Sequence, residues 1–260
     1  MYETHQENDP YYEFKKEYRD YIGQECDTLF RGVFEFNHKD NVYSEENFSV
    51  HKARKDSTLI FQCEQMTRFL SGEILKLKLT YQLSKDWIPT LVLIDKFISD
   101  LHVIEKYQIQ TKGPQLDYEF WSKYTHKHFH TSIPVPPRFQ VATSCITTSC
   151  LFLGSKKYDP TARNYYNILT CDNSWECKHL PAMKFVIAEK LSTNTTEVKV
   201  KGTMLKSSHY RIRAFSENSK VLQTPLNVYL SKHFLIPYLV EISEDITIRI
   251  KRLQEIENDD

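Results

Sequence analysis

The sequence predicts an all-β fold, a long antiparallel meander preceded by one helix. Three observations predict it. Apolar and polar residues alternate along many short segments, these segments recur at intervals of roughly 10 to 15 residues, and no helical pattern separates them. A twisted sheet of more than about ten strands tends to curl or to split. We therefore expect curved sheets or one open, barrel-like body.

Residues 1–23 are expected to form the helix. Asp9 can cap it, Pro10 suits its first position and Gly23 can end it. Its aromatic face would comprise Tyr11, Phe14, Tyr18 and Ile22, which are spaced for one side of a helix. Such a stripe either plugs one end of the sheet core or forms a lid over a pocket.

The clearest strand is expected over residues 74–83, where leucines and a tyrosine alternate with lysine, threonine and glutamine. One buried, apolar face and one solvent-exposed, polar face are typical of an antiparallel sheet. Residues 198–202 and 246–250 alternate in the same way. Weaker strands are expected at 29–36, 47–51, 58–64, 90–94, 102–110, 139–143, 150–154, 166–170, 184–189, 210–215, 226–230 and 238–242.

A proline-rich segment, residues 131–137, interrupts the meander near the middle of the chain. Pro134, Pro136 and Pro137 cannot donate backbone hydrogen bonds, so this segment is expected to be an extended connector and no central strand. It would join two similar halves, residues 24–130 and 138–260.

An internal repeat supports these two halves. Residues 83–94 and 230–242 both read L-S-K, then an aromatic residue, then I-P-x-L-V-x-I. A proline at the first position of a strand removes no ladder bond. Each copy is therefore expected to form a hairpin, and the match over a dozen positions indicates an ancient duplication.

This repeated unit resembles the long-meander proteins of the LolA/LppX-like class, VioE-like relatives included. The resemblance implies a curved, half-open sheet that holds lipids or other apolar molecules on its concave side. In the VioE-like relative the cavity steers a reactive intermediate. This sequence departs from the class because it has two units where LolA has one, and it lacks a lipobox and a signal peptide. No catalytic motif is shared by the class, so no residue roles carry over.

Composition excludes several function classes. Lys and Arg number 34 and Asp and Glu 34, so no net charge attracts nucleic acid or an anionic membrane. The glycine-rich phosphate-binding motifs are absent. With no signal peptide and no long apolar run, we expect a cytoplasmic protein without stable membrane insertion. The oligomeric state stays open.

Three histidines, His126, His128 and His130, alternate near the connector. On a strand they would share one face, about 6.6 Å between neighbours and about 13 Å between the outer two. One zinc ion can take an adjacent pair at most. We expect a polar strand or loop there and no metal site.

The six cysteines are expected to be reduced and mostly buried. Cys145 and Cys150, like Cys171 and Cys177, lack the close spacing of zinc ligands, and each pair could flank a hairpin. A nucleophilic Cys150 or Cys177 with His179 is conceivable, but nothing in the sequence indicates a thiolate. No cofactor is expected.

The best-supported function from sequence is a binding protein that holds a hydrophobic small molecule or lipid in an aromatic-lined cavity. Arginine guanidinium groups and tyrosine hydroxyls would form hydrogen bonds that orient the polar end of the ligand. The candidate ligand-binding residues are Tyr81, Trp87, Trp121, Arg138, Tyr165, Arg211 and Arg213. Two alternatives stay open: a pathway enzyme with tyrosine or histidine acid-base help, and a protein-interaction module.

Overall fold

The computed structural model describes residues 26–110, 114–159, 164–191, 195–200, 202–215, 224–231 and 235–256. The helix expected over residues 1–23 lies outside these residues. Within the described part of the chain, no helix is long and apolar enough to cross a membrane.

The all-β prediction is confirmed, and the strands form one sheet of 16 strands that is not closed into a barrel. Its first half comprises β1 (Cys26–His38), β2 (Asn41–Ala53), β3 (Leu59–Arg68), β4 (Ile74–Leu83), β5 (Pro89–Ile98), β6 (Leu101–Ile109), β7 (Gln115–Ser122) and β8 (Lys127–Pro134). Its second half comprises β9 (Gln140–Val141), β10 (Asn164–Thr170), β11 (Ala182–Lys190), β12 (Thr196–Val200), β13 (Thr203–Phe215), β14 (Leu226–Leu230), β15 (Pro237–Glu241) and β16 (Ile246–Glu255).

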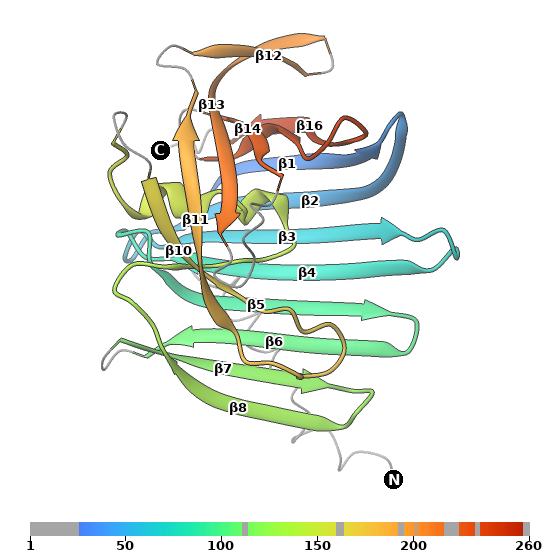
Figure 1. Cartoon of the computed structure of the whole chain (residues 1–260), viewed down its shortest axis with the longest axis vertical. Coiled ribbons are helices and arrows are strands. Elements are labelled where there is room, and N and C mark those ends of the chain that lie inside the picture. Colours follow the sequence, from blue (N-terminus) through green and yellow to red (C-terminus); the bar gives the residue numbers. More distant parts are fainter. Residues whose placement is uncertain are drawn as a thin grey trace.

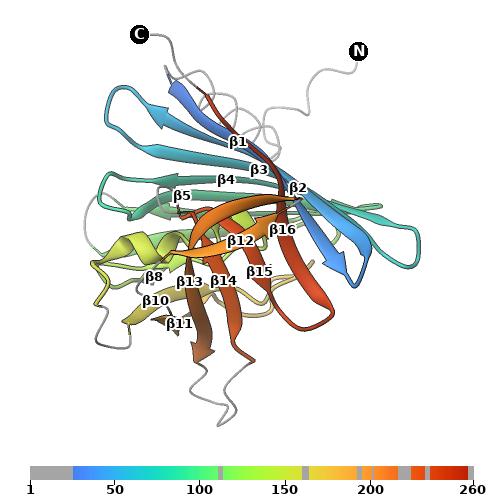
Figure 2. The same ribbon diagram turned by 90° about the horizontal axis from the view of Figure 1, so that it is seen from above.

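The strand order explains how one sheet can cover itself. It runs β8-β7-β6-β5-β4-β3-β2-β1-β16-β15-β14-β13-β11-β10-β9, with β12 paired to β13. All neighbours are antiparallel except β9 and β10. Because β1 pairs with both β2 and β16, the two halves join edge to edge. The sheet then curls, and β10, β11 and β13 cross one face of the first half (Figure 1). Figure 2 shows the two resulting layers from above.

The core lies between these layers. On the inner face of the first half, Phe61 and Tyr81 are fully buried. From the other layer Phe139 and Leu151 join the same apolar cluster. The alternation expected for residues 74–83 is confirmed in part: Leu77 and Leu79 are buried while Lys76 and Lys78 face outward. Thr80 and Gln82, which were expected on the exposed face, are buried as well, because the second half of the strand is covered on both faces.

Residues 150–154 were predicted as a strand, and this prediction is wrong. Cys150 lies in a turn, and residues 151–154 lie in a short 3-10 helix, η2 (Leu151–Ser155), which follows a shorter one, η1 (Ile146–Thr148). The run Leu151, Phe152, Leu153 has no alternation, so it buries apolar side chains on more than one side. Gly154 lets this turn approach Trp87, because a Cβ there would lie 2.4 Å from the indole ring.

The connector begins later than residue 131. Strand β8 extends to Pro134, and it is an end strand of the sheet. An edge strand tolerates proline because one row of its backbone groups has no ladder partner. Strand β7, which carries Tyr118 and Trp121, was not expected from the sequence.

Both repeated hairpins are confirmed, and they share details of backbone geometry. In β4–β5 the amide of Ser84 donates to the carbonyl of Ile88 at 2.9 Å, and in β14–β15 Ser231 donates to Ile236 at 2.9 Å. The residue before each Ile-Pro pair has a positive φ, 61° at Trp87 and 56° at Leu235. The two sequence copies thus share the serine-to-isoleucine hydrogen bond and the positive φ before Ile-Pro, although the second bond spans one residue more.

Candidate functional site

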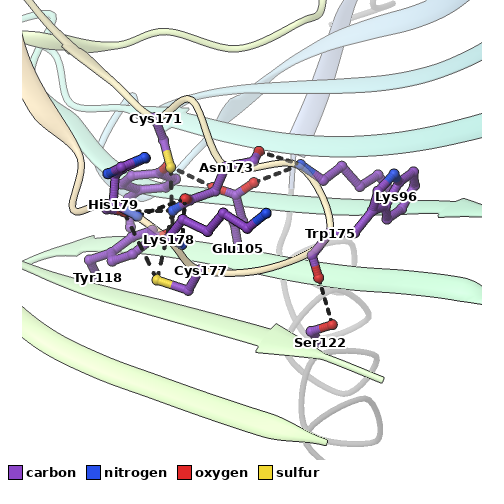
Figure 3. A network of polar contacts seen from close by, with 11 residues as sticks. Lys96, Glu105, Tyr118, Ser122, Cys171, Asn173, Trp175, Cys177, Lys178 and His179 are labelled. Carbon is purple, nitrogen blue, oxygen red and sulfur yellow. Dashed lines mark hydrogen bonds and ion pairs between the residues drawn. The ribbon is translucent and has the colours of Figure 1, made fainter. Parts of the chain in front are cut away.

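The candidate site is a cleft between β4–β6 and residues 171–173. These residues begin the loop 171–181, which connects β10 and β11 and lies over the inner face of β5–β7 (Figure 3). The cleft has a volume of about 260 Å³. It is lined by Leu77, Ile94, Lys96, Glu105, Tyr107, Ala142, Thr143, Ser144, Thr170, Cys171, Asp172, Asn173 and Lys184. Both halves of the chain contribute, so the site exists only when the sheet has curled.

Asn173 organises the loop. It is buried, and its Oδ1 accepts backbone N–H groups of Lys178 at 2.9 Å and His179 at 3.0 Å. Its Nδ2 donates to the carbonyl of His179 at 2.7 Å and to the hydroxyl of Tyr118 at 3.3 Å. One carboxamide therefore closes the loop and fastens it to β7.

A buried ion pair forms the floor of the cleft. Lys96 Nζ lies 3.0 Å from Glu105 Oε1 and donates to the carbonyl of Asn173 at 3.1 Å. The hydroxyl of Tyr107 donates to Glu105 Oε2 at 2.9 Å. Burial, and then the neighbouring Glu105, raise the pKa of Tyr107 well above its usual value. Each polar group of this trio is satisfied, as buried polar groups need to be.

A further bond ties the loop to the first half. Ser122 Oγ donates to the carbonyl of Trp175 at 2.7 Å. Lys96 Nζ also lies 5.9 Å from the centroid of the Trp175 ring, within cation–π range. The loop is thus held at two places, on β5 and β7.

Two thiols of the same loop lie close to Tyr118 and Asn173. Cys171 Sγ lies 3.5 Å from Tyr118 Oη, and Asn173 Nδ2 lies 3.7 Å from Cys177 Sγ. Burial raises the pKa of Cys171 and of Cys177. It also raises the pKa of Cys150 to about 12. Since the thiolate is the nucleophile, none of these cysteines is activated for attack.

The charged groups of the cleft compensate one another. Lys96 pairs with Glu105, and Lys184 Nζ lies 3.4 Å from Asp172 Oδ2. The other polar lining groups are hydroxyls, a thiol and an amide, while Leu77 and Ile94 add apolar surface. Such a cleft suits a small molecule with hydrogen-bonding groups, an apolar part and no net charge.

Two of the ligand residues predicted from the sequence, Tyr81 and Trp87, are both hydrogen-bonded to the side chain of Gln140. The Tyr81 hydroxyl donates to Gln140 Oε1 at 2.6 Å and accepts the N–H of Val141 at 3.0 Å. Gln140 Nε2 donates to the carbonyl of Trp87 at 2.6 Å. Both tyrosine contacts are to protein groups, and Tyr81 is fully buried. Its position is that of a core residue that fastens β9 to β4.

The other five predicted residues lie in three places. Trp121 faces outward and lines a separate cavity of about 530 Å³ with His102 and His126. Arg138 and Tyr165 are exposed. Arg211 and Arg213 lie on β13, where the buried Nε of Arg213 makes no hydrogen bond within the described residues. Apart from Trp121, these predicted residues do not line the cavities described here.

The histidines near the connector take different positions. His128 and His130 lie on the exposed face of β8, opposite Trp121 and Glu119. His128 Nε2 lies 3.3 Å from Glu119 Oε2, and His130 Nε2 lies 3.9 Å from Asp117 Oδ1. His126 precedes the strand, with a φ of 51°. His128 and His130 therefore each lie near a carboxylate of the neighbouring strand β7.

The sequence did not lead us to the residues of the cleft. For two of them, Lys96 and Glu105, the pattern of apolar and polar residues does contain an indication. In β5, Lys96 is in phase with the core residues Val92 and Ile94. In β6, Glu105 is in phase with Val103 and Tyr107. A charge at a core position needs a partner, so this break in the pattern indicates a buried pair. Asn173 carries no such signal, because it lies in a loop.

Comparison with known proteins supports the fold alone. No protein-family model matches the chain, and no curated protein is significantly similar to it in sequence. Among solved structures, it is similar to a β-barrel-like protein of the domain of unknown function DUF1849 from Brucella abortus. That match has a TM-score of 0.53 and 8% identity, over 88% of this chain and 98% of the other. A DUF1089 family protein from Pseudomonas aeruginosa matches with a TM-score of 0.46 and 10% identity, over 76% and 89% of the two chains.

Proposed function

We propose that this protein is a non-catalytic binding protein for a small amphiphilic molecule of no net charge, held in the cleft beneath residues 171–173. The observation that carries the proposal is the internally compensated lining of that cleft. Its two lysines pair with its two carboxylates. A charged ligand would compete with the buried Lys96–Glu105 pair, whereas hydroxyl or amide groups can bond to these charged groups without separating them.

The titratable groups support binding over catalysis. A catalytic acid, base or nucleophile needs a pKa close to the working pH. In the cleft, burial moves the pKa values of Tyr107 and Cys171 upward, away from neutrality. Both groups therefore stay protonated at neutral pH, where they act as fixed hydrogen-bond donors.

The size of the cleft narrows the ligand further. Pockets for drug-sized molecules span about 300 to 1,000 Å³. At about 260 Å³, this cleft fits a smaller molecule or one end of a longer amphiphile. The resemblance to LolA/LppX-like proteins favours the second possibility, a lipid-like ligand whose polar end enters the cleft.

Native mass spectrometry of the protein from its own host tests the proposal. We expect a defined small-molecule adduct. The variant Ala142→Trp places an indole in the cleft from an exposed lining position and should lose the adduct. Lys85→Trp, at an exposed turn position outside the cleft, is the matched control and should retain it. A wild-type chain without an adduct, or equal retention by both variants, would contradict the proposal.

An exposed apolar hairpin favours a second candidate function, protein interaction. At the β3–β4 turn Leu70 is fully exposed, and Met66, Phe69 and Ile74 are each more than 40% exposed. Contiguous exposed apolar groups commonly mark an interaction surface. We propose that this tip contacts a protein partner. Crosslinking in host extract should capture one defined partner, and the double variant F69S/L70S should lose it while Val42→Ser keeps it. Equal capture by F69S/L70S would exclude the tip.

A further inference from the structure

A second polar cluster is buried away from the cleft. Among the described residues, Glu46, Cys63 and Cys145 form a group whose potential ligand atoms all lie within 4.8 Å of one another. All three side chains are buried, Cys145 and Glu46 completely. They come from β2, from β3 and from the residue that precedes η1. The curled sheet brings these distant segments together.

The Glu46 carboxylate anchors the cluster. Its Oε2 accepts the N–H of Ile146 at 2.7 Å, and its Oε1 accepts the N–H of Thr147 at 3.0 Å. The hydroxyl of Thr147 donates to the same Oε1. The Cys63 sulfur in turn lies within 4.8 Å of the Cys145 sulfur and of a Glu46 carboxylate oxygen. Two sulfur atoms and a carboxylate oxygen thus lie close together, and the Thr147 hydroxyl is hydrogen-bonded to that carboxylate.

We propose that Cys63, Cys145 and Glu46 bind a thiophilic divalent cation, zinc in the first instance, with the Thr147 hydroxyl or a water molecule as fourth ligand. Zinc prefers four ligands in a tetrahedron, with Zn–S bonds near 2.3 Å and Zn–O bonds near 2.0 to 2.2 Å. In such a tetrahedron the ligand atoms lie roughly 3.5 to 3.8 Å apart. Ligand atoms already within 4.8 Å need to close by about 1 Å at most.

Charge balance agrees with a divalent ion. When one M²⁺ binds, each thiol releases a proton, and two M–S bonds replace two S–H bonds. In the bound cluster two thiolates and one carboxylate carry three negative charges against the two positive charges of the ion, which leaves a net charge of −1. The two backbone N–H groups and the Thr147 hydroxyl that face this charge stay in place. No oxidant or reductant is required.

The ion would join the two layers of the molecule. Glu46 and Cys63 lie on neighbouring strands of the first half, whereas Cys145 begins the η1 turn of the second layer. Ser144 and Thr143, which line the cleft, directly precede Cys145. Metal binding would therefore also fix one wall of the cleft, but the metal site does not depend on the proposed ligand.

Cobalt is the probe that tests the site, because Co²⁺ replaces Zn²⁺ and reports its ligands by absorption. The full-length, reduced, metal-free chain without a histidine tag is titrated with Co²⁺ and then with Zn²⁺. We expect one equivalent to produce tetrahedral d–d bands and a sulfur-to-cobalt charge-transfer band, both abolished by one equivalent of zinc. Bands that are absent or octahedral in the wild-type chain would overturn the proposal.

Matched double variants locate the ion. C63S/C145S should lose the charge-transfer band, whereas C171S/C177S, which removes the other pair of neighbouring thiols, should keep it. The opposite result would overturn the assignment and place the ion at the cleft loop. If C63S/C145S does not fold, Cys145→Ser alone decides the matter. Loss of about half of the charge-transfer intensity supports the two-thiolate site, and an unchanged band overturns it.

Discussion

At the residue scale, burial decides whether a tyrosine supports the fold or faces solvent. Tyr81 and Tyr165 were equal candidates for ligand contact in the sequence. Tyr81 is fully buried and its hydroxyl joins Gln140 to Val141, whereas Tyr165 is about half exposed. The difference comes from the side of the strand on which each lies, and that depends on how the second layer covers the first.

The substitution Tyr81→Phe should therefore destabilise the protein. It leaves the Gln140 side chain and the Val141 N–H without their buried partner, which costs about 1 to 3 kcal/mol. Tyr165→Phe removes an exposed hydroxyl and should change the free energy of unfolding by less than about 0.5 kcal/mol. Urea denaturation of both variants checks this. Equal stability of the two would show that the Tyr81 hydroxyl has no structural role.

A second residue-scale prediction concerns pH. Burial, and then the neighbouring Arg31, lower the pKa of His51 below its usual 6.5. The unfolded chain therefore takes up the His51 proton first as the pH falls, and the folded state loses stability below about pH 6.5. Above that pH both states are neutral at this residue, so it has no effect there.

His51→Gln should remove this part of the pH dependence. The free energy of unfolding of wild type and variant, each measured at pH 8 and at pH 5, gives the comparison. The fall between the two pH values should be smaller in the variant. An equal or larger fall in the variant would show that His51 is not protonated preferentially in the unfolded chain.

At the element scale, the repeated hairpins show what local sequence can predict. The spacing between Leu-Ser-Lys and Ile-Pro predicted two hairpin turns. In both turns the serine N–H donates to the isoleucine carbonyl, and the residue before Ile-Pro has a positive φ. Hairpins form between neighbouring segments, so spacing and alternation suffice for them. The η2 turn was mistaken for a strand because a short apolar run has no period, and only its packing against Trp87 distinguishes the two.

That packing leads to a prediction for η2. In Gly154→Ala the new Cβ would lie 2.4 Å from the Trp87 ring, so the turn must shift, at a cost of about 1 to 3 kcal/mol. In a Trp87→Ala background the same change should be nearly neutral, because the ring is gone. A double-mutant cycle by denaturation measures this coupling. Additive effects would show that the two residues do not constrain each other.

At the scale of the whole molecule, the strand order is the feature that sequence could not supply. The pairing of β1 with β16 joins residues more than 200 positions apart. No local pattern encodes it. The cleft and the buried Glu46 cluster depend on the same curling, since each takes side chains from both layers. This is why the strands were mostly predictable from alternation, while the residues that converge at these sites were not.

The continuous sheet and shared core also predict how the molecule unfolds. Although the sequence suggests two halves, 24–130 and 138–260, each half buries apolar side chains of the other, so neither should remain folded alone. Cys63 and Cys150 are buried reporters on the two sides of the connector. In urea with a chelator present, pulsed alkylation read by mass spectrometry should give both thiols one unfolding midpoint, coincident with the loss of strand signal in circular dichroism. Two separate midpoints would instead mean that the halves are independent domains, and that the β1–β16 ladder can open without loss of the core.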